Sequence, residues 1–562
     1  MFLKKRSALL LLLLSACQVQ QPPVVENVSP SQQVSSTQLW LDRGQPKLIV
    51  GIVVDQMRAD YLQRFAPNFS EGGFMRLMRQ GVTVANTHYN YIPTYTGPGH
   101  ASVYSGTTPA THGIIANDWY DRNLGKAVYC AEDTSVQVLG SNRGDAASPH
   151  RLLATNISDE LKLSTARKAK VVGVSLKDRG AVMPAGHLAD GAYWYNWNDG
   201  SINSSTWYAQ QLPQWAQEFN RQNLADEYLK NTWDLFLPAE KYTASGPDDQ
   251  PYERIFKGKE TATFPYNLPE LSKSNNPYSL LAYTPWGNTL VTEMALAALQ
   301  GENLGQDDTP DLLAVSYSST DIIGHGFGLR SKELEDVYIR LDREIERLLK
   351  ELDNQVGEGN YLLFLTADHA AADVPQYFID ERIPAGYYDD EETAKQTNAF
   401  LQKKYGEGKW VEWAENYQIY LNQQFIAEKG LSLTKVQEEV AEFVLGFPGV
   451  VDAIPASAMR YNEYSFGLRN KLQLGYYQPR SGDVLLILPP EWIHRMTYGT
   501  SHGSGYNYDT HVPLLFYGWQ VPEGVRITRE QKITDIAPTV SFMVGIPLPS
   551  GSIGRPIPEL IR

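Results

Sequence analysis

The sequence predicts an α/β fold in which a doubly wound, mostly parallel sheet carries inserted cap segments. Short apolar runs rich in Val, Ile and Leu recur along the chain, and each ends abruptly in polar residues. Near-continuous apolar strands are what a parallel sheet requires when helices cover both of its faces. Segments with helical periodicity separate these runs, and this alternation of strands with helices is typical of α/β proteins.

Five apolar runs are predicted to be core strands, at residues 48–54, 171–176, 312–317, 361–365 and 512–517. The clearest predicted helix spans 332–353, where Leu334, Leu341 and Ile345 belong to a set of apolar residues at three- and four-residue steps. Further helices are predicted at 289–300 and 534–544. The last strand and helix indicate that the chain finishes in the core.

Two stretches interrupt the alternation and are interpreted as insertions that cap the strand ends, at about 190–280 and 380–490. In the first, the aromatic run 193–197 precedes Asp199-Gly200, which is a hairpin signal. In the second we predict strands at 417–421, 450–454 and 484–488. A helix is predicted there from a Thr434–Gln437 capping box to Gly446.

The N-terminus has the pattern of an export signal. Basic residues 4–6 precede the apolar run 8–14, which is too short to span a bilayer, and Leu-Ser-Ala-Cys17 follows. This ending resembles a bacterial lipoprotein box, which implies that Cys17 is lipidated; an ordinary cleaved signal peptide is the alternative. We predict a signal peptide at 1–17, a tether at 18–45 and one large domain at 46–562. The protein would be an exported lipoprotein of the periplasm or cell envelope, with membrane contact only through its lipid anchor.

Composition excludes two classes of protein. The 562 residues include 49 Lys and Arg against 64 Asp and Glu, which gives a net charge of −15. So acidic a chain lacks the basic surface that nucleic acids require, and no nucleic-acid partner is expected. With only two cysteines the chain has no disulfide scaffold, and Cys130 is expected to be a free, buried thiol if Cys17 carries lipid.

Residues that suit metal binding cluster where the predicted strands end, which is where α/β folds bind their ligands. Three are aspartates and three are histidines: Asp55, Asp321, His325, Asp368, His369 and His502. They can form two sites that mix imidazole with carboxylate, which suits zinc with open coordination positions. Asp321-x-x-x-His325 is predicted to lie in a glycine-containing loop flexible enough for both side chains to reach one ion.

A nucleophile is predicted at Thr96, in the segment Thr96-Gly97-Pro98-Gly99-His100 that precedes a predicted helix at 101–105. A hydroxyl at the start of a helix faces unpaired backbone N–H groups, which form an anion site. The glycines would let an anion approach closely. Threonine is a weak nucleophile unless it is activated, for example by a metal. Read alone, Thr96 could also be a simple helix cap.

Taken together, these motifs resemble the alkaline phosphatase superfamily from about residue 48 to residue 549. Thr96-Gly-Pro-Gly-His, Asp55, the Asp321/His325 pair, Asp368-His369 and His502-Gly occur in the order seen in that family. The resemblance implies one zinc ion held by Asp321, His325 and His502. It implies a second held by Asp55, Asp368, His369 and the nucleophile Thr96.

Two further signals resemble the phosphate-irrepressible (PafA-type) alkaline phosphatases. Asn117 matches an asparagine that hydrogen-bonds a phosphoryl oxygen, and Lys177 and Arg179 match the Lys-x-Arg pair of that group. A guanidinium fork and an ammonium suit the two negative charges of a phosphate monoester. Since Lys177 stands where the best-known family members build a third site, no Mg²⁺ is expected there.

The resemblance implies hydrolysis of small-molecule phosphate monoesters through a phosphothreonine, with an alkaline optimum, by a monomer. A phosphodiesterase or nucleotide pyrophosphatase on the same core is an alternative, because those relatives also use threonine. A catalytically silent lipoprotein that binds zinc or phosphate is another. A cytosolic mutase disagrees with the leader, and a sulfatase would need Cys or Ser at position 96.

Overall fold

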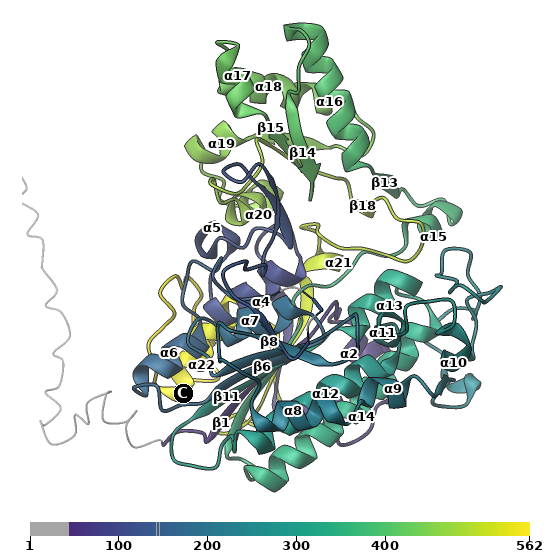
Figure 1. Cartoon of the computed structure of the whole chain (residues 1–562), viewed down its shortest axis with the longest axis vertical. Coiled ribbons are helices and arrows are strands. Elements are labelled where there is room, and N and C mark those ends of the chain that lie inside the picture. The colour runs from purple at the N-terminus through teal and green to yellow at the C-terminus, as the bar shows by residue number, and fades with distance from the viewer. Residues whose placement is uncertain (1–43, 142, 145, 562) are drawn as a thin grey trace, which may run out of the picture. The chain divides into compact units, whose positions relative to one another are not determined.

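The computed structural model describes residues 44–141, 143–144 and 146–561, and Figure 1 shows their arrangement. The predicted signal peptide, Cys17 and nearly all of the predicted tether lie outside these residues. None of the helices in the described part of the chain combines the length and apolar character that a membrane span needs.

The core is an eleven-stranded sheet, and its centre is parallel, as predicted. β1 (Leu48–Val54) pairs in parallel with β11 (Asp311–Tyr317) and β12 (Tyr361–Thr366), and β11 pairs in parallel with β6 (Val171–Ser175). β19 (His511–Gly518) is antiparallel to β12. The outer strands are β2 (Val82–His88), β20 (Val525–Ile527), β21 (Gln531–Lys532), β7 (Gly191–Tyr195), β8 (Ile202–Ser205) and β5 (Val138–Leu139).

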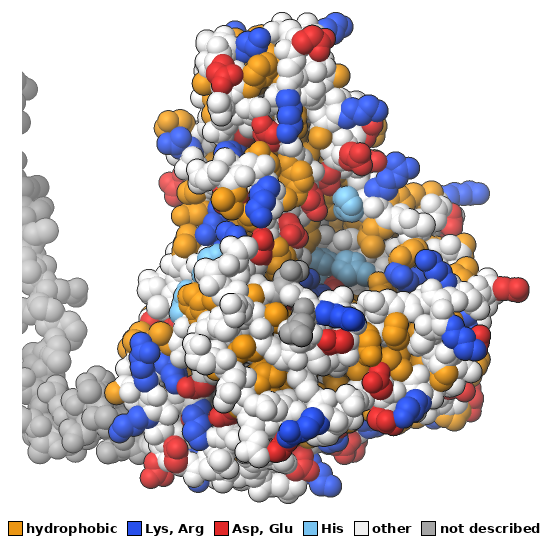
Figure 2. All heavy atoms as spheres, in the orientation of Figure 1, with side chains coloured by type: hydrophobic (Ala, Val, Ile, Leu, Met, Phe, Trp, Pro, Cys, Tyr) orange, Lys and Arg blue, Asp and Glu red, His pale blue; other side chains and the backbone are white. Residues whose placement is uncertain are grey.

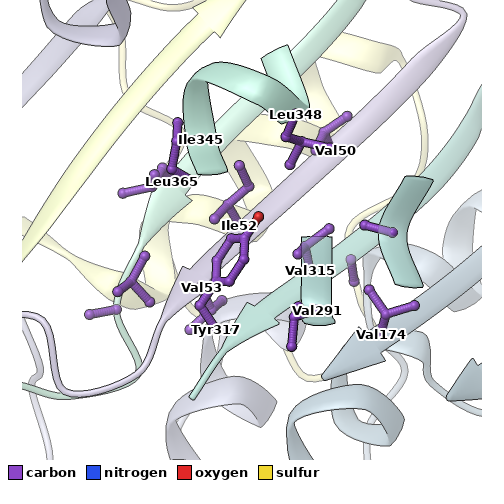
Figure 3. Close-up of a cluster of buried hydrophobic side chains, with 14 of the residues drawn as sticks. Val50, Ile52, Val53, Val174, Val291, Val315, Tyr317, Ile345, Leu348 and Leu365 are labelled. Atoms are coloured by element: carbon purple, nitrogen blue, oxygen red, sulfur yellow. The ribbon is translucent and has the colours of Figure 1, made fainter. Parts of the chain in front are cut away.

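Helices cover the sheet in two groups (Figure 1). One group consists of α4 (Thr96–Ser105), α6 (Ile157–Ser164), α7 (Asp178–Ala185) and α22 (Ile536–Val544). The other contains α8 (Gln214–Arg221), α12 (Pro285–Gly301), α13 (Ser319–Phe327) and α14 (Lys332–Gln355). Every residue of β1 is buried, because apolar side chains alternate toward the two helical layers. Figure 3 shows part of this core, including Val291 of α12 and Ile345 and Leu348 of α14.

A separate small sheet, here called the cap, lies within the stretch predicted as the second insertion. Its strands are β14 (Val411–Glu415), β15 (Gln418–Leu421), β17 (Val484–Ile487) and β16 (Asp452–Pro455), in that order. Its main helices are α16 (Asp390–Tyr405), α18 (Leu433–Val444) and α20 (Gly467–Gly475). Trp410, Val440 and Val484 belong to a hydrophobic core that the cap forms for itself.

The segment 190–280 differs from the cap insertion that its sequence predicted. Its first two strands, β7 and β8, extend the central sheet, because β7 pairs in parallel with β6. Periodicity shows that a strand exists but not which sheet it joins, so this difference was invisible in sequence. The predicted N-cap of α18 was also wrong. Ser432 caps the helix by accepting from Lys435 N, and the Gln437 side chain instead donates to Asp483.

A buried carboxyl group lies under the α14 layer. Glu333, in the first turn of α14, is fully buried, and one of its oxygens accepts a hydrogen bond of 2.6 Å from the Tyr266 hydroxyl. Its other oxygen has no hydrogen-bond partner among the described residues. Burial raises the pKa of Glu333 to about 8 from its ordinary 4.5, because the charged form is poorly solvated.

Glu333 should therefore make the fold less stable as pH rises. Between pH 4.5 and about 8 the unfolded chain releases this proton and the folded chain keeps it, so the free energy of unfolding falls with pH. Glu333→Gln removes this dependence. As pH rises from 5 to 8, the free energy of unfolding of the variant should therefore increase relative to that of the wild type, by at most about 1.4 kcal/mol per pH unit. Urea unfolding at each pH measures this difference. Glu351→Gln, on the same helix, is the control. An equal difference from wild type at pH 5 and pH 8 would contradict the prediction.

Candidate active site

The parallel strands place the predicted metal ligands along one edge of the sheet. Asp55 directly follows β1, Asp368 lies two residues beyond β12, and Asp321 follows β11. Since these three strands are parallel neighbours, their carboxyl ends meet at this edge. His502 reaches the same place from the loop before β19.

The ligand candidates form two groups. In each group the potential ligand atoms lie within 4.8 Å of one another: Asp321, His325 and His502 in one, Asp55, Asp368 and His369 in the other. These are the same two sets that the family resemblance implies. All of these residues are buried except His325, whose side chain is 29% exposed. The first group is therefore the one that opens toward solvent.

Asp321 and His325 lie on a helix, so the prediction of a loop was wrong. α13 spans Ser319–Phe327, and four residues of helix bring both side chains to one face, with His325 Nε2 3.1 Å from Asp321 Oδ1. Gly324 serves a close approach rather than flexibility. A Cβ at this position would lie 2.0 Å from Gln56 Oε1, and the other amide atom of Gln56, Nε2, donates to Asp321 Oδ1 at 2.7 Å.

All three histidines are oriented by backbone carbonyls. The acceptors for their Nδ1–H groups are Thr500 O at 2.7 Å for His325, Ala370 O at 2.9 Å for His369 and Thr94 O at 2.6 Å for His502. Each Nε2 therefore presents its lone pair to a carboxylate, at 3.1 to 3.7 Å. This orientation by second partners is a regular property of metal-binding histidines.

The charges of the two groups fit bound cations. Asp55 Oδ1, Asp368 Oδ2 and His369 Nε2 are buried and have no hydrogen-bond partner among the described residues. Burial lowers the pKa of His369 to about 4, although Asp55 acts in the opposite direction. Burial raises the pKa of Asp368 well above its usual range, and the nearby Asp55 carboxylate adds to the effect. In the second group, a neutral His369 imidazole that faces unpaired oxygens of Asp55 and Asp368 is a donor set for a divalent metal ion.

Thr96 is the first residue of α4 and is buried. The two residues before it contact the first ligand group, since Thr94 O accepts from His502 Nδ1 and the Tyr95 ring packs edge-on against the His502 ring. One helical turn later, His100 Nδ1–H donates to Thr96 O at 2.9 Å, and the same nitrogen lies 3.5 Å from Asp368 Oδ2. Gly99 permits the close packing, because a Cβ there would lie 2.2 Å from Asp368 O. Gly97 N–H donates to Asn117 Oδ1 at 2.9 Å, which leaves the amide protons of Asn117 directed elsewhere.

Lys177 bridges the two metal-ligand groups. Its Nζ lies 2.7 Å from Asp55 Oδ2 and 2.5 Å from Asp321 Oδ2, and only 7% of the residue is exposed. Burial favours the neutral amine, but the carboxylates of Asp321 and Asp55 outweigh this and raise the pKa of Lys177. Lys177 thus carries a buried positive charge in contact with one aspartate of each group.

Arg179 is held by two residues that the sequence analysis did not single out. Its Nη1 donates to the Tyr129 hydroxyl at 3.0 Å, and its backbone N–H donates to Asp178 Oδ1 at 2.6 Å. The Tyr129 hydroxyl in turn donates to Asp178. Asp178 stands between Lys177 and Arg179 in sequence, but Tyr129 is 50 residues away from Arg179 and carries no local signal. Gln56 is a further contact that sequence reasoning missed, and His100 was noted there only as part of the Thr96 motif.

The cap contacts the hairpin that carries these residues. β3 (Asp118–Asp121) follows Asn117 directly, and β4 (Lys126–Tyr129) ends at Tyr129. From the cap, Asn416 Nδ2 donates to Asp118 O at 2.9 Å, and Asp483 pairs with Arg122 at 3.0 Å. Cys130, next along the chain, is a free buried thiol as predicted. In Figure 2, histidine side chains line a hollow beneath the cap.

Each ligand group should hold its own metal ion. His369→Ala removes one imidazole from the Asp55/Asp368 group, so it should lower the amount of Zn²⁺ retained after dialysis while the Asp321/His325/His502 group still binds. Inductively coupled plasma mass spectrometry measures the metal per chain. His494→Ala, a surface histidine paired with Asp390, is the control. Unchanged metal content in His369→Ala would contradict the assignment.

The sequence of this chain matches a known family over most of its length. Residues 49–512 match the model of the type I phosphodiesterase / nucleotide pyrophosphatase family. The chain is 43% identical to alkaline phosphatase PhoV of Synechococcus elongatus over 519 residues, 92% of this chain and 93% of that protein. It is 42% identical over 522 residues to a protein of Myroides odoratus named calcium-transporting ATPase, covering 92% and 95%.

Alkaline phosphatase PafA of Elizabethkingia meningoseptica is similar in both sequence and structure. The sequences are 41% identical over 520 residues, 92% of this chain and 94% of PafA. A crystal structure of wild-type PafA superposes with a TM-score of 0.88 at 40% identity, covering 92% of this chain and 99% of that one. The chain therefore belongs to the type I phosphodiesterase / nucleotide pyrophosphatase family, and it is a PafA-type member of the alkaline phosphatase superfamily.

Proposed function

We propose that this protein is an alkaline phosphatase that hydrolyses phosphate monoesters through a phosphothreonine at Thr96 and releases inorganic phosphate. One observation carries the proposal: the buried cation Lys177 bridges two carboxylate–imidazole groups, and a helix that begins at the buried Thr96 packs against Asp368 through His100. PhoV and PafA, both about 40% identical, are named alkaline phosphatases. The architecture matches what phosphoryl transfer needs, which is positioning and charge stabilisation.

We assign one Zn²⁺ to each ligand group, because mixed imidazole and carboxylate donors with open positions suit zinc. When bound, these ions would supply Lewis acidity for the phosphoryl and hydroxyl oxygens. Thr96 is assigned to the Asp55/Asp368/His369 group as an additional ligand. We assign no third site to Mg²⁺, because Lys177 already places a positive charge against Asp55 and Asp321.

Three side chains are positioned to hold the phosphoryl oxygens. The amide protons of Asn117 are available, since its oxygen accepts from Gly97 N–H. Lys177 adds an ammonium and Arg179 a guanidinium, whose Nε is buried without a hydrogen-bond partner among the described residues. Two cations match the dianion of a monoester, whereas a diester carries one charge fewer.

The reaction then has two displacements. The Thr96 hydroxyl loses its proton to solvent and its oxygen attacks phosphorus, so that a new O–P bond forms. The ester P–O bond breaks as the leaving oxygen takes the electron pair and then a proton from water. Water enters from the side that the alcohol has left and hydrolyses the phosphothreonine, which restores Thr96 and yields phosphate. The exposed edge of His325 marks the side that opens to solvent. Loss of protons from Thr96 and water favours an alkaline optimum.

Phosphodiester hydrolysis is the second candidate, because the matching family model describes phosphodiesterases and nucleotide pyrophosphatases. The pair Lys177 and Arg179 favours monoesters over it. The ATPase name of the Myroides odoratus relative points to a related reaction, since removal of a terminal phosphate from ATP is also phosphoryl transfer to water. A silent binding protein is disfavoured by the coincidence of Thr96 with both ligand groups.

We further propose that the protein is an exported, lipid-anchored monomer. The sequence around Cys17 supports the anchor, with the tether at 18–45 separating it from the catalytic domain at 46–562. Mass spectrometry of the mature N-terminus tests this assignment, since acylation at Cys17 adds a defined mass and an ordinary cleaved signal peptide does not.

Substrate class is tested by comparing p-nitrophenyl phosphate with bis-p-nitrophenyl phosphate at pH 8–9. We expect a strong monoester preference in kcat/KM. Thr96→Ala should abolish turnover, and Lys177→Ala should lower monoester kcat/KM by about 100-fold or more, since its charge contacts the reacting centre. Diester turnover should fall much less. A diester preference that is indifferent to Lys177→Ala would move the protein to the phosphodiesterase branch.

Tyr129 should position Arg179 for catalysis. Tyr129→Phe removes the hydroxyl that accepts from Arg179 and donates to Asp178, so kcat/KM for p-nitrophenyl phosphate should fall about tenfold. In an Arg179→Ala background the same substitution should have almost no further effect, because the two residues act as one unit. Tyr120→Phe, on the same hairpin, is the control. Additive losses in the double variant would contradict this role.

A further inference from the structure

An arginine surrounded by aromatic rings lies beside the exposed metal-ligand candidate His325. The guanidinium of Arg254 stacks over the rings of Tyr283, Tyr498 and Phe256, with centroid distances of 4.5, 5.1 and 5.5 Å. Its Nη1 also donates to the hydroxyls of Tyr283 at 3.0 Å and Tyr498 at 2.7 Å. We call these four residues the Arg254 cluster.

Contacts at Gly326 and the segment after Tyr498 connect the Arg254 cluster to the first ligand group. Arg254 N–H donates to Gly326 O at 2.9 Å, and Gly326 directly follows His325. A Cβ on Gly326 would lie 3.3 Å from the Tyr283 ring and 3.8 Å from Arg254 Cδ. On the opposite side, Tyr498 precedes Gly499 and Thr500, and Thr500 O orients the His325 ring at 2.7 Å. The cluster thus adjoins the only partly exposed ligand of either group.

Arg254 has no carboxylate partner among the described residues, in contrast to Arg330, Arg340, Arg347 and Arg469. Its recorded side-chain hydrogen bonds all leave from Nη1, so Nε and Nη2 donate to no described residue. Because both tyrosine hydroxyls accept from Arg254, each keeps its own proton to donate. The cluster therefore offers a fixed positive charge and several free donors at the opening of the site.

We propose that the Arg254 cluster is a subsite for an anionic leaving group, and specifically for the second phosphate of a phosphoanhydride such as inorganic pyrophosphate or a nucleoside diphosphate. This inference rests on the proposed function. A substrate whose terminal phosphoryl group lies beside Thr96 and Lys177 can extend its remaining part past the partly exposed His325, which the cluster adjoins. A guanidinium fork with flanking hydroxyls matches the oxygens of a phosphate.

The reaction keeps the two displacements already described. Thr96 oxygen bonds to the terminal phosphorus, the anhydride P–O bond breaks, and the departing phosphate takes the electron pair. Water then hydrolyses the phosphothreonine, so pyrophosphate and one water give two orthophosphates. Arg254 contributes by neutralising negative charge on the departing phosphate. The leaving groups of an alkyl phosphate or of p-nitrophenyl phosphate carry no phosphate group that could contact Arg254.

The test compares two substrates on zinc-loaded protein. The ratio of kcat/KM for pyrophosphate to kcat/KM for p-nitrophenyl phosphate should fall about tenfold or more in Arg254→Ala, since a hydrogen-bonded charge is lost from only one of them. Arg254→Lys, which keeps the charge but not the fork, should give an intermediate ratio. Tyr498→Phe, which removes one hydroxyl, should lower the ratio about twofold to threefold.

A binding measurement separates recognition from turnover. Isothermal titration of methylenediphosphonate, which has no cleavable anhydride oxygen, should show a Kd about tenfold weaker in Arg254→Ala, while the Kd for orthophosphate changes far less. Arg469→Ala is the matched control, because this cap arginine also stacks on a tyrosine ring but is paired with Asp452. Arg469→Ala should leave the kcat/KM ratio and the two Kd values as in the wild type.

Two outcomes would overturn the inference in distinguishable ways. In the first outcome, p-nitrophenyl phosphate is hydrolysed, Arg254→Ala lowers kcat/KM equally for both substrates, and the Kd for methylenediphosphonate is unchanged. Arg254 is then a structural residue, and only the subsite is refuted. If wild-type protein hydrolyses neither substrate, the proposed function fails and the subsite fails with it.

Discussion

The burial of three carboxylates and two imidazoles at one edge of a sheet, with the partly exposed His325 beside them, is the constraint on which the site depends. Buried charges are tolerated only when they are paired or bound to metal. Lys177 contacts Asp55 and Asp321, but carboxylate and imidazole atoms of the second group remain unpaired. The backbone carbonyls that orient all three histidines show that this arrangement is part of the fold, because they turn every Nε2 toward the carboxylates.

The parallel centre of the sheet makes this concentration possible. β1, β11, β12 and β6 run in the same direction, so the residues that follow them converge without any of the strands having to bend. Two glycines then let separate elements approach. Gly99 allows α4 to pack on the backbone of Asp368, and Gly324 allows α13 to pack on Gln56. Larger side chains there would push Thr96 or His325 away from the ligand groups.

The cap supports the hairpin that adjoins the proposed phosphate-binding residues. Asn117 and Tyr129 lie at the two ends of the β3–β4 hairpin, and the cap holds that hairpin through Asn416 and Asp483. The orientation of Arg179 thus depends on Tyr129, and the hairpin of Tyr129 depends on the cap. The cap is therefore linked to Arg179 by a chain of contacts, although none of its own residues is among the proposed catalytic residues.

The sequence alone determined the core strands, the fold class and the identity of the metal-ligand candidates, because apolar runs ending in Asp or His are local patterns. It did not determine that Asp321 and His325 share a helix, that β7 and β8 extend the central sheet, or that Ser432 caps α18. It also gave no sign of Tyr129 or Arg254, whose contacts join residues far apart in sequence. Only tertiary structure decided these features, since strand order, helix packing and the surroundings of a buried charge arise from long-range contacts that no local pattern records.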